Sequence, residues 1–252
     1  MKRTAMDELE KHKSELVEAA STLLAVQHCY GENVRKQALA AFGKLVDAHM
    51  ITTGVLGTAL LRVNGKFAEI TPTSTRRNAL FASFVIGLTI CECAICEGRY
   101  LQAIALLRQE AETLAALCEV TAGKRKHGKT PNMSGLASDI ARLYGDLSAG
   151  AHVAVHAVVH AATEWTGSIE GASGPAAMSR HFPMFDEHLA RRLYGLHIYL
   201  MIRLIEQLNA DFSQMHPEAF TSREIEAIDM VIDLMVQEKI LERDGPLTGA
   251  IA

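Results

Sequence analysis

The segment YLQAIALLRQEAETLAALCEV, from Tyr100 to Val120, decides the fold class. It contains neither glycine nor proline, and most of its residues are good helix formers. At about 100° per residue, four leucines share one face of such a helix: Leu106, Leu107, Leu114 and Leu117. Arg108 and Glu112 lie one turn apart on the opposite face, flanked by small alanines that allow another helix to approach. The segment predicts a long amphipathic helix packed within an all-α protein.

Similar periodicity on both sides of this segment predicts further helices that pack on one another. Gly31 is expected to end the first helix, and Gly98 to end the helix before Tyr100. Thr221 and Glu224 have the spacing of a capping box, in which each side chain satisfies a free amide at a helix start. The predicted helices cover residues 7–30, 32–50, 76–97, 100–120, 136–144, 146–165 and 185–208, and a last one runs from about 221 to 244–246.

Three segments interrupt the predicted helices. Residues 63–75 contain an Asn-Gly pair and a proline, which predict a loop or short hairpin, and residues 123–132 form a basic loop. Residues 166–179 are rich in glycine and serine and predict a further loop. We therefore expect an N-terminal helical hairpin at residues 1–62, a helical bundle at 76–212, and a C-terminal helix and tail at 213–252, unless all three form one domain.

The composition favours a soluble helical protein. Of the 252 residues 49% are hydrophobic and only 6 are proline, and the formal net charge of -4 disfavours non-specific binding to DNA. No apolar run follows Lys2 and Arg3, so a secretory signal is not expected. The apolar stretch from Phe81 to Cys96 is interrupted by Glu92 and is shorter than the roughly 18 to 20 residues that span a bilayer, which predicts a buried helix and no membrane partner. The odd number of cysteines, five, indicates reduced thiols in the cytoplasm.

The segment from Asp146 to Trp165 places three histidines four residues apart. On a helix, His152, His156 and His160 fall within an arc of about 80° opposite a face of aliphatic residues and Trp165, with Thr163 between them. Three interpretations remain open: a metal site formed by these histidines and Glu164, a catalytic or nucleic-acid-binding face, and a solvated or interface surface. A strand also fits the spacing, but the alanine content favours a helix.

The Arg108–Glu112 pair has two interpretations. It is either a hydrogen-bonded pair that orients a site or a surface salt bridge. Glu110 projects toward the leucine face of the same helix, where it is expected in the core. The sequence has no glycine-rich phosphate loop, no Gly-x-Ser-x-Gly elbow and no His-Glu-x-x-His pair, which removes the commonest hydrolase motifs.

The cysteines and the basic loop give weaker signals. Cys91 and Cys93 point about 200° apart on a helix, which favours structural thiols over a zinc site. Lys124, Arg125 and Lys126 form a short basic run that either contacts phosphates or is solvated.

Two runs of sequence, from Gly98 to Glu112 and from Leu143 to His152, resemble a group of bacterial helical proteins of unknown function. These proteins look like distant relatives of the higher eukaryotes and prokaryotes nucleotide-binding (HEPN) superfamily. The likeness covers residues 76–210 and leaves out the N-terminal hairpin. It implies a homodimer of four- to five-helix bundles in which the helix of the Arg108–Glu112 pair packs near the end of the second run.

Related HEPN proteins are often metal-independent ribonucleases of toxin or phage-defence systems. The resemblance implies that His152 is a general acid or base, while nearby cationic or polar groups stabilise the phosphorane charge. The implied catalytic set is His152, Ser148, Arg108, Glu112 and Asp146, and the implied nucleic-acid contacts are Lys124, Arg125, Lys126 and Tyr144. HEPN nucleases place an arginine four to six residues before the histidine, where this chain has Asp146 and Leu147. Either Arg108 supplies the charge, or the bundle has been kept without the activity.

Three functions are compatible with these patterns. The first is a HEPN-like cytoplasmic homodimer that binds RNA or a nucleotide and cleaves RNA without a cofactor. The second is a helical metalloprotein that uses the cluster of His152, His156 and His160. The third is a non-enzymatic helical interaction protein. DNA is not expected as a partner of any of them.

Overall fold

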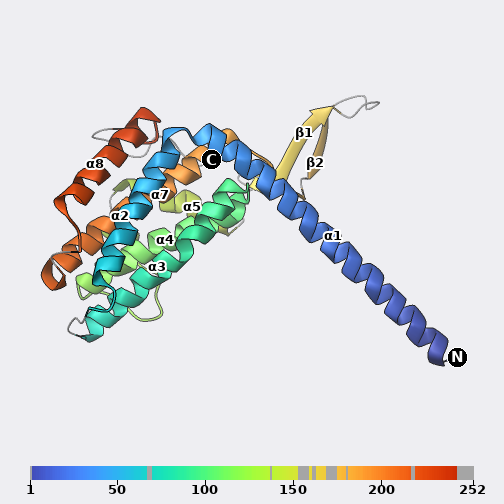
Figure 1. Cartoon of the computed structure of the whole chain (residues 1–252), viewed down its shortest axis with the longest axis horizontal. Coiled ribbons are helices and arrows are strands. Elements are labelled where there is room, and N and C mark those ends of the chain that lie inside the picture. Colours follow the sequence, from blue (N-terminus) through green and yellow to red (C-terminus); the bar gives the residue numbers. More distant parts are fainter. Residues whose placement is uncertain are drawn as a thin grey trace.

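The computed structural model describes residues 2–66, 70–136, 138–152, 159–160, 163–168, 175–179, 181–216 and 219–242. In these ranges the chain forms a helical bundle, which confirms the predicted all-α class (Figure 1). The bundle consists of α2 (Lys44–Val63), α3 (Pro72–Cys96), α4 (Tyr100–Thr121), α5 (Ser138–Ala151), α7 (Glu187–Met215) and α8 (Ser222–Gln237), with a 3-10 turn η1 (Met133–Gly135) before α5.

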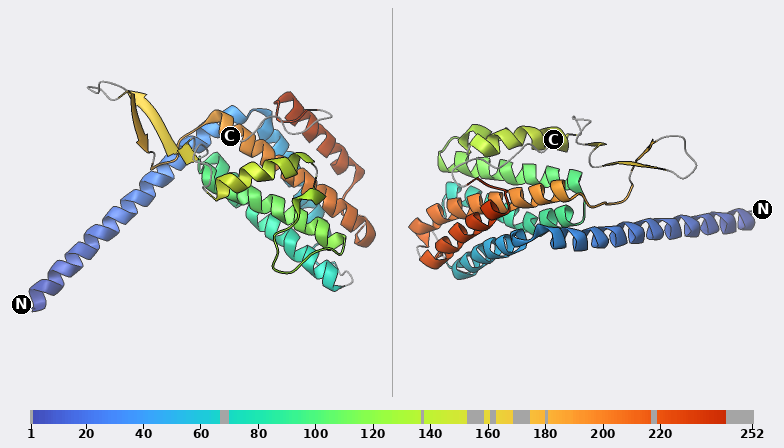
Figure 2. Two further views of the ribbon diagram at one scale, coloured as in Figure 1. Left: turned by 180° about the vertical axis from the view of Figure 1, so that it is seen from behind. Right: turned by 90° about the horizontal axis from the view of Figure 1, so that it is seen from above.

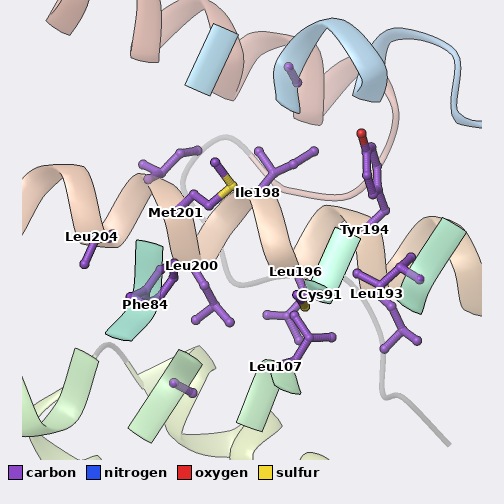
Figure 3. Close-up of a cluster of buried hydrophobic side chains, with 14 of the residues drawn as sticks. Phe84, Cys91, Leu107, Leu193, Tyr194, Leu196, Ile198, Leu200, Met201 and Leu204 are labelled. Atoms are coloured by element: carbon purple, nitrogen blue, oxygen red, sulfur yellow. The ribbon is translucent and has the colours of Figure 1, made fainter. Parts of the chain in front are cut away.

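The central element of the bundle is α7, which contacts α2, α3, α4 and the first helix, α1 (Lys2–Phe42). Its consecutive residues Leu200 and Met201 are both fully buried, so neighbours cover more than one face of this helix. Figure 3 shows them in one cluster with Leu107 of α4. The buried cluster also contains Leu45 and Val231, so it includes residues of all three segments that the sequence suggested.

The first helix differs from its prediction at Gly31. Helix α1 (Lys2–Phe42) passes through Gly31 without a break. A Cβ at this position would lie 3.3 Å from Oε2 of Glu97, so the glycine serves close packing against the end of α3. The break falls at Gly43, whose φ of 54° is readily adopted only by glycine.

The two N-terminal helices do not form the predicted antiparallel hairpin. The chain turns by 96° between Leu9–Phe42 and Lys44–Val63, whereas a hairpin requires a reversal of direction. The N-terminal part of α1 projects away from the bundle, and α1 contacts α3 and α7 nearer its other end (Figures 1 and 2). The projecting part exposes large apolar side chains: Leu9, Leu16, Val17, Leu23 and Leu24.

The stretch after α5 also differs from its prediction. Instead of a helix to residue 165 and a loop at 166–179, α5 ends at Ala151, and β1 (Glu164–Ser168) pairs antiparallel with β2 (Pro175–Ser179). Trp165 lies opposite Met178 in this hairpin. Tryptophan and threonine favour strands, and at residues 164–168 this preference prevails over the helical periodicity. The hairpin projects from the same end of the bundle as α1 (Figure 2).

Three helix boundaries differ from the sequence prediction for local reasons. Helix α3 begins at Pro72, earlier than predicted, because Thr71 and Ser74 form a capping box in front of it. Helix α7 continues to Met215, beyond its predicted end at residue 208. Helix α8 keeps the predicted capping box at its start but ends at Gln237, well before residues 244–246.

Helix α3 is more exposed than the sequence predicts. By length and composition it is able to cross a membrane, which corrects the expectation that this apolar stretch is too short. It packs against α4 and α7, yet only 33% of its most apolar window is buried. Phe81 and Phe84 face the core, whereas Ile86 and Ile90 are exposed. Its place in the bundle is compatible with a soluble protein.

Gly98 fixes the turn between α3 and α4. Its φ is +73°, and an added Cβ would lie 2.8 Å from the carbonyl oxygen of Met184. Because alanine is strained at this φ and meets that backbone oxygen, we expect Gly98→Ala to lower the free energy of unfolding by about 1–3 kcal/mol in urea denaturation. In α2, no atom of the described part of the chain lies within 4 Å of a Cβ added at Gly54. Gly54→Ala is the control and should raise the free energy by up to about 1 kcal/mol, so equal losses in the two variants would contradict the prediction.

Glu224 links the capping box of α8 to α2. Its amide donates to the Thr221 hydroxyl, and its carboxylate accepts hydrogen bonds of 2.6 and 2.7 Å from the Arg62 guanidinium. The Arg62 hydrogen bonds are the largest cause that lowers the pKa of Glu224 to about 2, against the opposing effect of burial. Thr58 and Thr221 contribute in the same direction as Arg62.

This lowered pKa predicts an acid dependence of stability. Because the folded-state pKa lies below the ordinary 4.5, Glu224 stabilises the fold above pH 4.5, and the contribution is lost as the pH falls toward 2. We expect Glu224→Gln to remove this part of the pH dependence in urea denaturation. Glu226→Gln removes an exposed carboxylate of the same helix and is expected to keep the wild-type dependence. Indistinguishable pH profiles of the two variants would refute the assignment.

Candidate functional site

Helices α4 and α5 lie side by side and bring together residues that are far apart in the sequence (Figure 2). Three aliphatic residues of α5 are buried at helical spacing and hold it on the bundle: Ile140, Leu143 and Leu147. Tyr144 and Ser148 therefore lie at the edge of this contact and are half-buried. His152 follows the end of α5, and its amide donates to the Ser148 carbonyl at 3.1 Å.

Arg108 is the centre of a polar cluster between α4 and α5. Its Nε donates to Oε1 of Glu112 at 2.9 Å, and its Nη1 lies 2.6 Å from Nε2 of His152. The Tyr144 hydroxyl donates to the same Glu112 oxygen at 2.6 Å, and its ring centre lies 5.6 Å from the guanidinium carbon. We call Arg108, Glu112, Tyr144 and His152 the Arg108 cluster. The helix of the Arg108–Glu112 pair thus lies next to His152, as predicted.

The contact with Arg108 determines the tautomer of His152. A guanidinium has hydrogen-bond donors and no acceptor, so Nε2 of His152 accepts the hydrogen bond from Arg108. The proton of the neutral imidazole is then on Nδ1. His152 presents an unprotonated Nε2 whose lone pair is occupied by Arg108.

Charge and burial fix the protonation of the other members of the cluster. The Tyr144 hydroxyl, followed by the charge of Glu112, raises the pKa of Arg108, so this group stays cationic. Burial, followed by the hydrogen bond to Glu112, raises the pKa of Tyr144, so its hydroxyl stays protonated and donates. Glu112 therefore has two donors that hold it beside Arg108.

The Arg108–Glu112 pair has features of both interpretations that the sequence allowed. The side chains are 21% and 27% exposed, so the pair is neither buried in the core nor free on the surface. Unlike an isolated surface salt bridge, it has Tyr144 and His152 as further partners. His152 is exposed, so a ligand can reach the cluster from solvent.

Asp146 and Ser148 have different relations to the cluster. Ser148 lies in the last turn of α5, four residues before His152, and its carbonyl accepts the hydrogen bond of the His152 amide. Asp146 lies close to Arg192 of α7, whose pKa is lowered by burial and partly restored by the Asp146 charge. On α5, Asp146 lies about 200° around the helix axis from Ser148.

The basic run after α4 lies apart from the Arg108 cluster. Arg125 donates to a Glu119 carboxylate oxygen at 3.3 Å and to the carbonyl oxygens of Lys126 and Lys129 at 3.0 and 2.8 Å. It therefore holds its own loop closed, while Lys124 and Lys126 are exposed. The loop follows the far end of α4, about 20 Å along the helix axis from Arg108. These side chains do not share a site with His152.

The predicted histidine metal site remains a prediction. His156 lies outside the described residues, and Glu164 begins β1, where only the backbone is described. Nε2 of His152 faces the Arg108 guanidinium, and a positive charge at that position opposes a metal cation.

A different group has ligand atoms close enough for a metal ion. Among the described residues, Cys91 of α3, Glu110 of α4 and His197 of α7 have such atoms within 4.8 Å of one another. The sequence placed Glu110 in the core and Cys91 among structural thiols, but it did not single out His197. In the sequence, this group is marked only by Glu110 and His197, each a polar residue within the apolar face of its helix. That the two residues meet is determined by tertiary packing, which the sequence pattern does not reveal.

Chemically, the Arg108 cluster combines a fixed cation with an imidazole nitrogen that is able to accept a proton once Arg108 no longer donates to it. A cation beside a base suits the binding of an anion and the removal of a proton from a hydroxyl next to it. Glu112 and Tyr144 hold the cation in place. In comparisons with known proteins, no protein family, curated protein or solved structure matches the chain.

Proposed function

We propose that the chain is a HEPN-like protein that binds RNA or a nucleotide at the Arg108 cluster and cleaves RNA there without a metal ion. The observation that carries the proposal is the contact of 2.6 Å between Nη1 of Arg108 and Nε2 of His152. It joins two residues that the sequence resemblance assigned to one site. A role in a toxin or phage-defence system, in the cytoplasm, is part of the same proposal.

Arg108 takes the part of the arginine that HEPN nucleases place before the histidine. Asp146 and Leu147 stand at those positions in this chain, and Leu147 is buried. The guanidinium reaches His152 from the neighbouring helix instead. Its charge is available for a phosphate, because Glu112 and Tyr144 occupy only part of its donors.

In the proposed reaction, the RNA phosphate binds Arg108 and displaces Nε2 of His152 from the guanidinium. The freed Nε2 takes the proton of the ribose 2′-hydroxyl, and the 2′ oxygen attacks phosphorus. The bond from phosphorus to the 5′ oxygen breaks, and this oxygen takes a proton from solvent. Arg108 stabilises the charge on the phosphorane, and the Ser148 hydroxyl donates to a phosphate oxygen. The need for a 2′-hydroxyl selects RNA over DNA.

Tyr144 has a positioning role in this proposal. Its hydroxyl donates to Glu112, and its ring lies against the guanidinium, so it orients Arg108 rather than stacking on a base. Glu112 acts in the same way through its 2.9 Å hydrogen bond to Arg108.

A second candidate function is assembly with another copy of the chain through α1, as expected for a helical interaction protein. The projecting part of α1 has Leu9, Leu16 and Leu23 exposed by 64%, 58% and 50%, at intervals of one heptad. A lone helix with an exposed apolar stripe is marginal in water, and pairing of two such helices buries the stripe. This function is compatible with the first, because it also supplies the homodimer that the resemblance implies.

The cleavage proposal is tested with the purified full chain and total RNA in buffer without added divalent cations. The wild type is expected to bind and cleave RNA. We expect His152→Ala to lower the cleavage rate about 100-fold or more with binding retained, and Arg108→Ala to lose both. His12→Ala on the projecting helix is the control with wild-type activity. The proposal is wrong if the wild type neither binds nor cleaves RNA, or if cleavage requires added Mg²⁺.

The assembly proposal is tested by light scattering on a double variant, Leu16→Glu with Leu23→Glu. Two charges on the apolar stripe should convert dimers into monomers. The matched control is Ser14→Glu with Ser21→Glu, which adds the same charge about 160° around the helix and should leave dimers intact. A monomeric wild type, or equal behaviour of the two double variants, would refute assembly through this stripe.

A further inference from the structure

Three side chains with metal-binding atoms meet inside the bundle where α3, α4 and α7 come together. Cys91, Glu110 and His197 are 1%, 5% and 0% exposed. Figure 3 shows Cys91 among the core side chains, beside Leu107 and Leu196. The potential ligand atoms of the three residues lie within 4.8 Å of one another.

The contact between Glu110 and His197 leaves polar atoms of both residues without a hydrogen bond. Nδ1 of His197 lies 3.0 Å from Oε2 of Glu110. Oε1 of Glu110 and Nε2 of His197 are buried, and no described residue is their hydrogen-bond partner. Burying such atoms without a partner is costly, and proteins normally supply one. The Glu110–His197 pair by itself therefore does not account for the chemistry of this part of the core.

The residue types match the donors that zinc prefers. Zn²⁺ binds thiolate sulfur, imidazole nitrogen and carboxylate oxygen, usually with tetrahedral geometry. Bond lengths of about 2.0–2.3 Å require donor atoms about 3.3–3.8 Å apart. Nδ1 of His197 and Oε2 of Glu110 are 3.0 Å apart, and the ligand atoms of all three residues lie within 4.8 Å of one another. Small side-chain movements therefore bring the three donor atoms to the spacing that zinc requires.

Glu110 also borders a small cavity, and a further histidine lies close to His197. Glu110 lines a small cavity of about 30 Å³ between α3 and α4, together with Phe84, Gly87 and Thr113. Neither Cys91 nor His197 lines this cavity, and its volume is sufficient for one water molecule beside Glu110. His49 lies near the site, with its ring centre 5.6 Å from that of His197.

We propose that Cys91, Glu110 and His197 bind one Zn²⁺ ion that joins α3, α4 and α7. In the metal-free protein, burial and the adjacent Glu110 raise the pKa of the Cys91 thiol, so the thiol is protonated. Binding releases this proton to solvent and forms the thiolate–zinc bond, with no change of oxidation state. The ion has a structural role, because its ligands are buried and Glu110 projects from α4 away from the Arg108–Glu112 face. It takes no part in the proposed RNA reaction.

The proposal is tested on the full chain purified without chelators, by elemental analysis and by replacement of the ion with Co²⁺. We expect one equivalent of zinc and, with Co²⁺, a thiolate charge-transfer band in the near ultraviolet. Cys91→Ala should lose both the metal and the band. Cys93→Ala changes a neighbouring thiol that points about 200° away on α3, and it should retain them. Zn²⁺ should raise the melting temperature of the wild type and of Cys93→Ala, and leave that of Cys91→Ala unchanged.

Thiol alkylation followed by mass spectrometry gives a result that does not depend on a folded variant. Because Cys91 is buried, the wild type is alkylated in urea near its unfolding midpoint, where Zn²⁺ should slow the reaction of Cys91 and leave that of exposed Cys29 unchanged. The proposal is overturned if the wild type binds neither zinc nor cobalt. It is also overturned if the Cys91→Ala variant retains the charge-transfer band. In that outcome a water molecule is the partner of Glu110. RNA cleavage in buffer without added divalent cations is measured separately, so neither result decides the other.

Discussion

The burial of α7 on more than one face constrains the rest of the structure. A helix with a single apolar stripe can remain on the surface, but consecutive buried residues such as Leu200 and Met201 require neighbours around the helix. Each such side chain contributes about 1.5–3 kcal/mol when fully buried. Helices α1, α2, α3 and α4 supply the cover. Gly195 allows the segment after α8 to close the remaining gap, because a Cβ at this position would overlap the Ile240 side chain.

Because α4 is one of the helices that cover α7, its opposite faces lie in two different environments. One face packs toward α7 and includes Glu110, and another faces α5 and solvent and includes Arg108 and Glu112. Near the surface, water reduces the cost of charge, and hydrogen bonds from Arg108 and Tyr144 orient the Glu112 carboxylate. In the core, charge without sufficient partners is costly, and Glu110 has His197 and Cys91 as neighbours. Glu110 and Glu112 are only two residues apart on one helix, yet their carboxylates have different surroundings and different partners.

The sequence predicts those features that depend on local periodicity and capping. The helix from Tyr100 is found almost at its predicted bounds, and the Thr221–Glu224 capping box is present, because both depend on residues within one helix. The predicted helix end at Gly31 is wrong, because the sequence alone does not distinguish a glycine required for close packing from one that ends a helix. The partners of Glu110 and Glu224 lie 87 and 162 residues away, and no local pattern identifies them.

The same distinction between local pattern and tertiary packing applies to the residues of the candidate site. Helical spacing placed Arg108 beside Glu112, and the resemblance placed both near His152, because these relations follow from single helices and from one packing contact. The resemblance assigned Asp146 to the site, whereas the effect of its charge on Arg192 of α7 depends on tertiary packing, which no local pattern identifies.

The distance between Arg108 and His152 along the chain has a further consequence for the proposed function. When an arginine stands four to six residues before a histidine, as in HEPN nucleases, the short stretch of chain between them limits their separation. Here the two residues come from opposite sides of the α4–α5 contact, so their 2.6 Å separation depends on the packing of α5 through Ile140, Leu143 and Leu147. A small shift of α5 changes the distance between the cation and the base. The proposed chemistry is therefore coupled to the stability of this one helix contact.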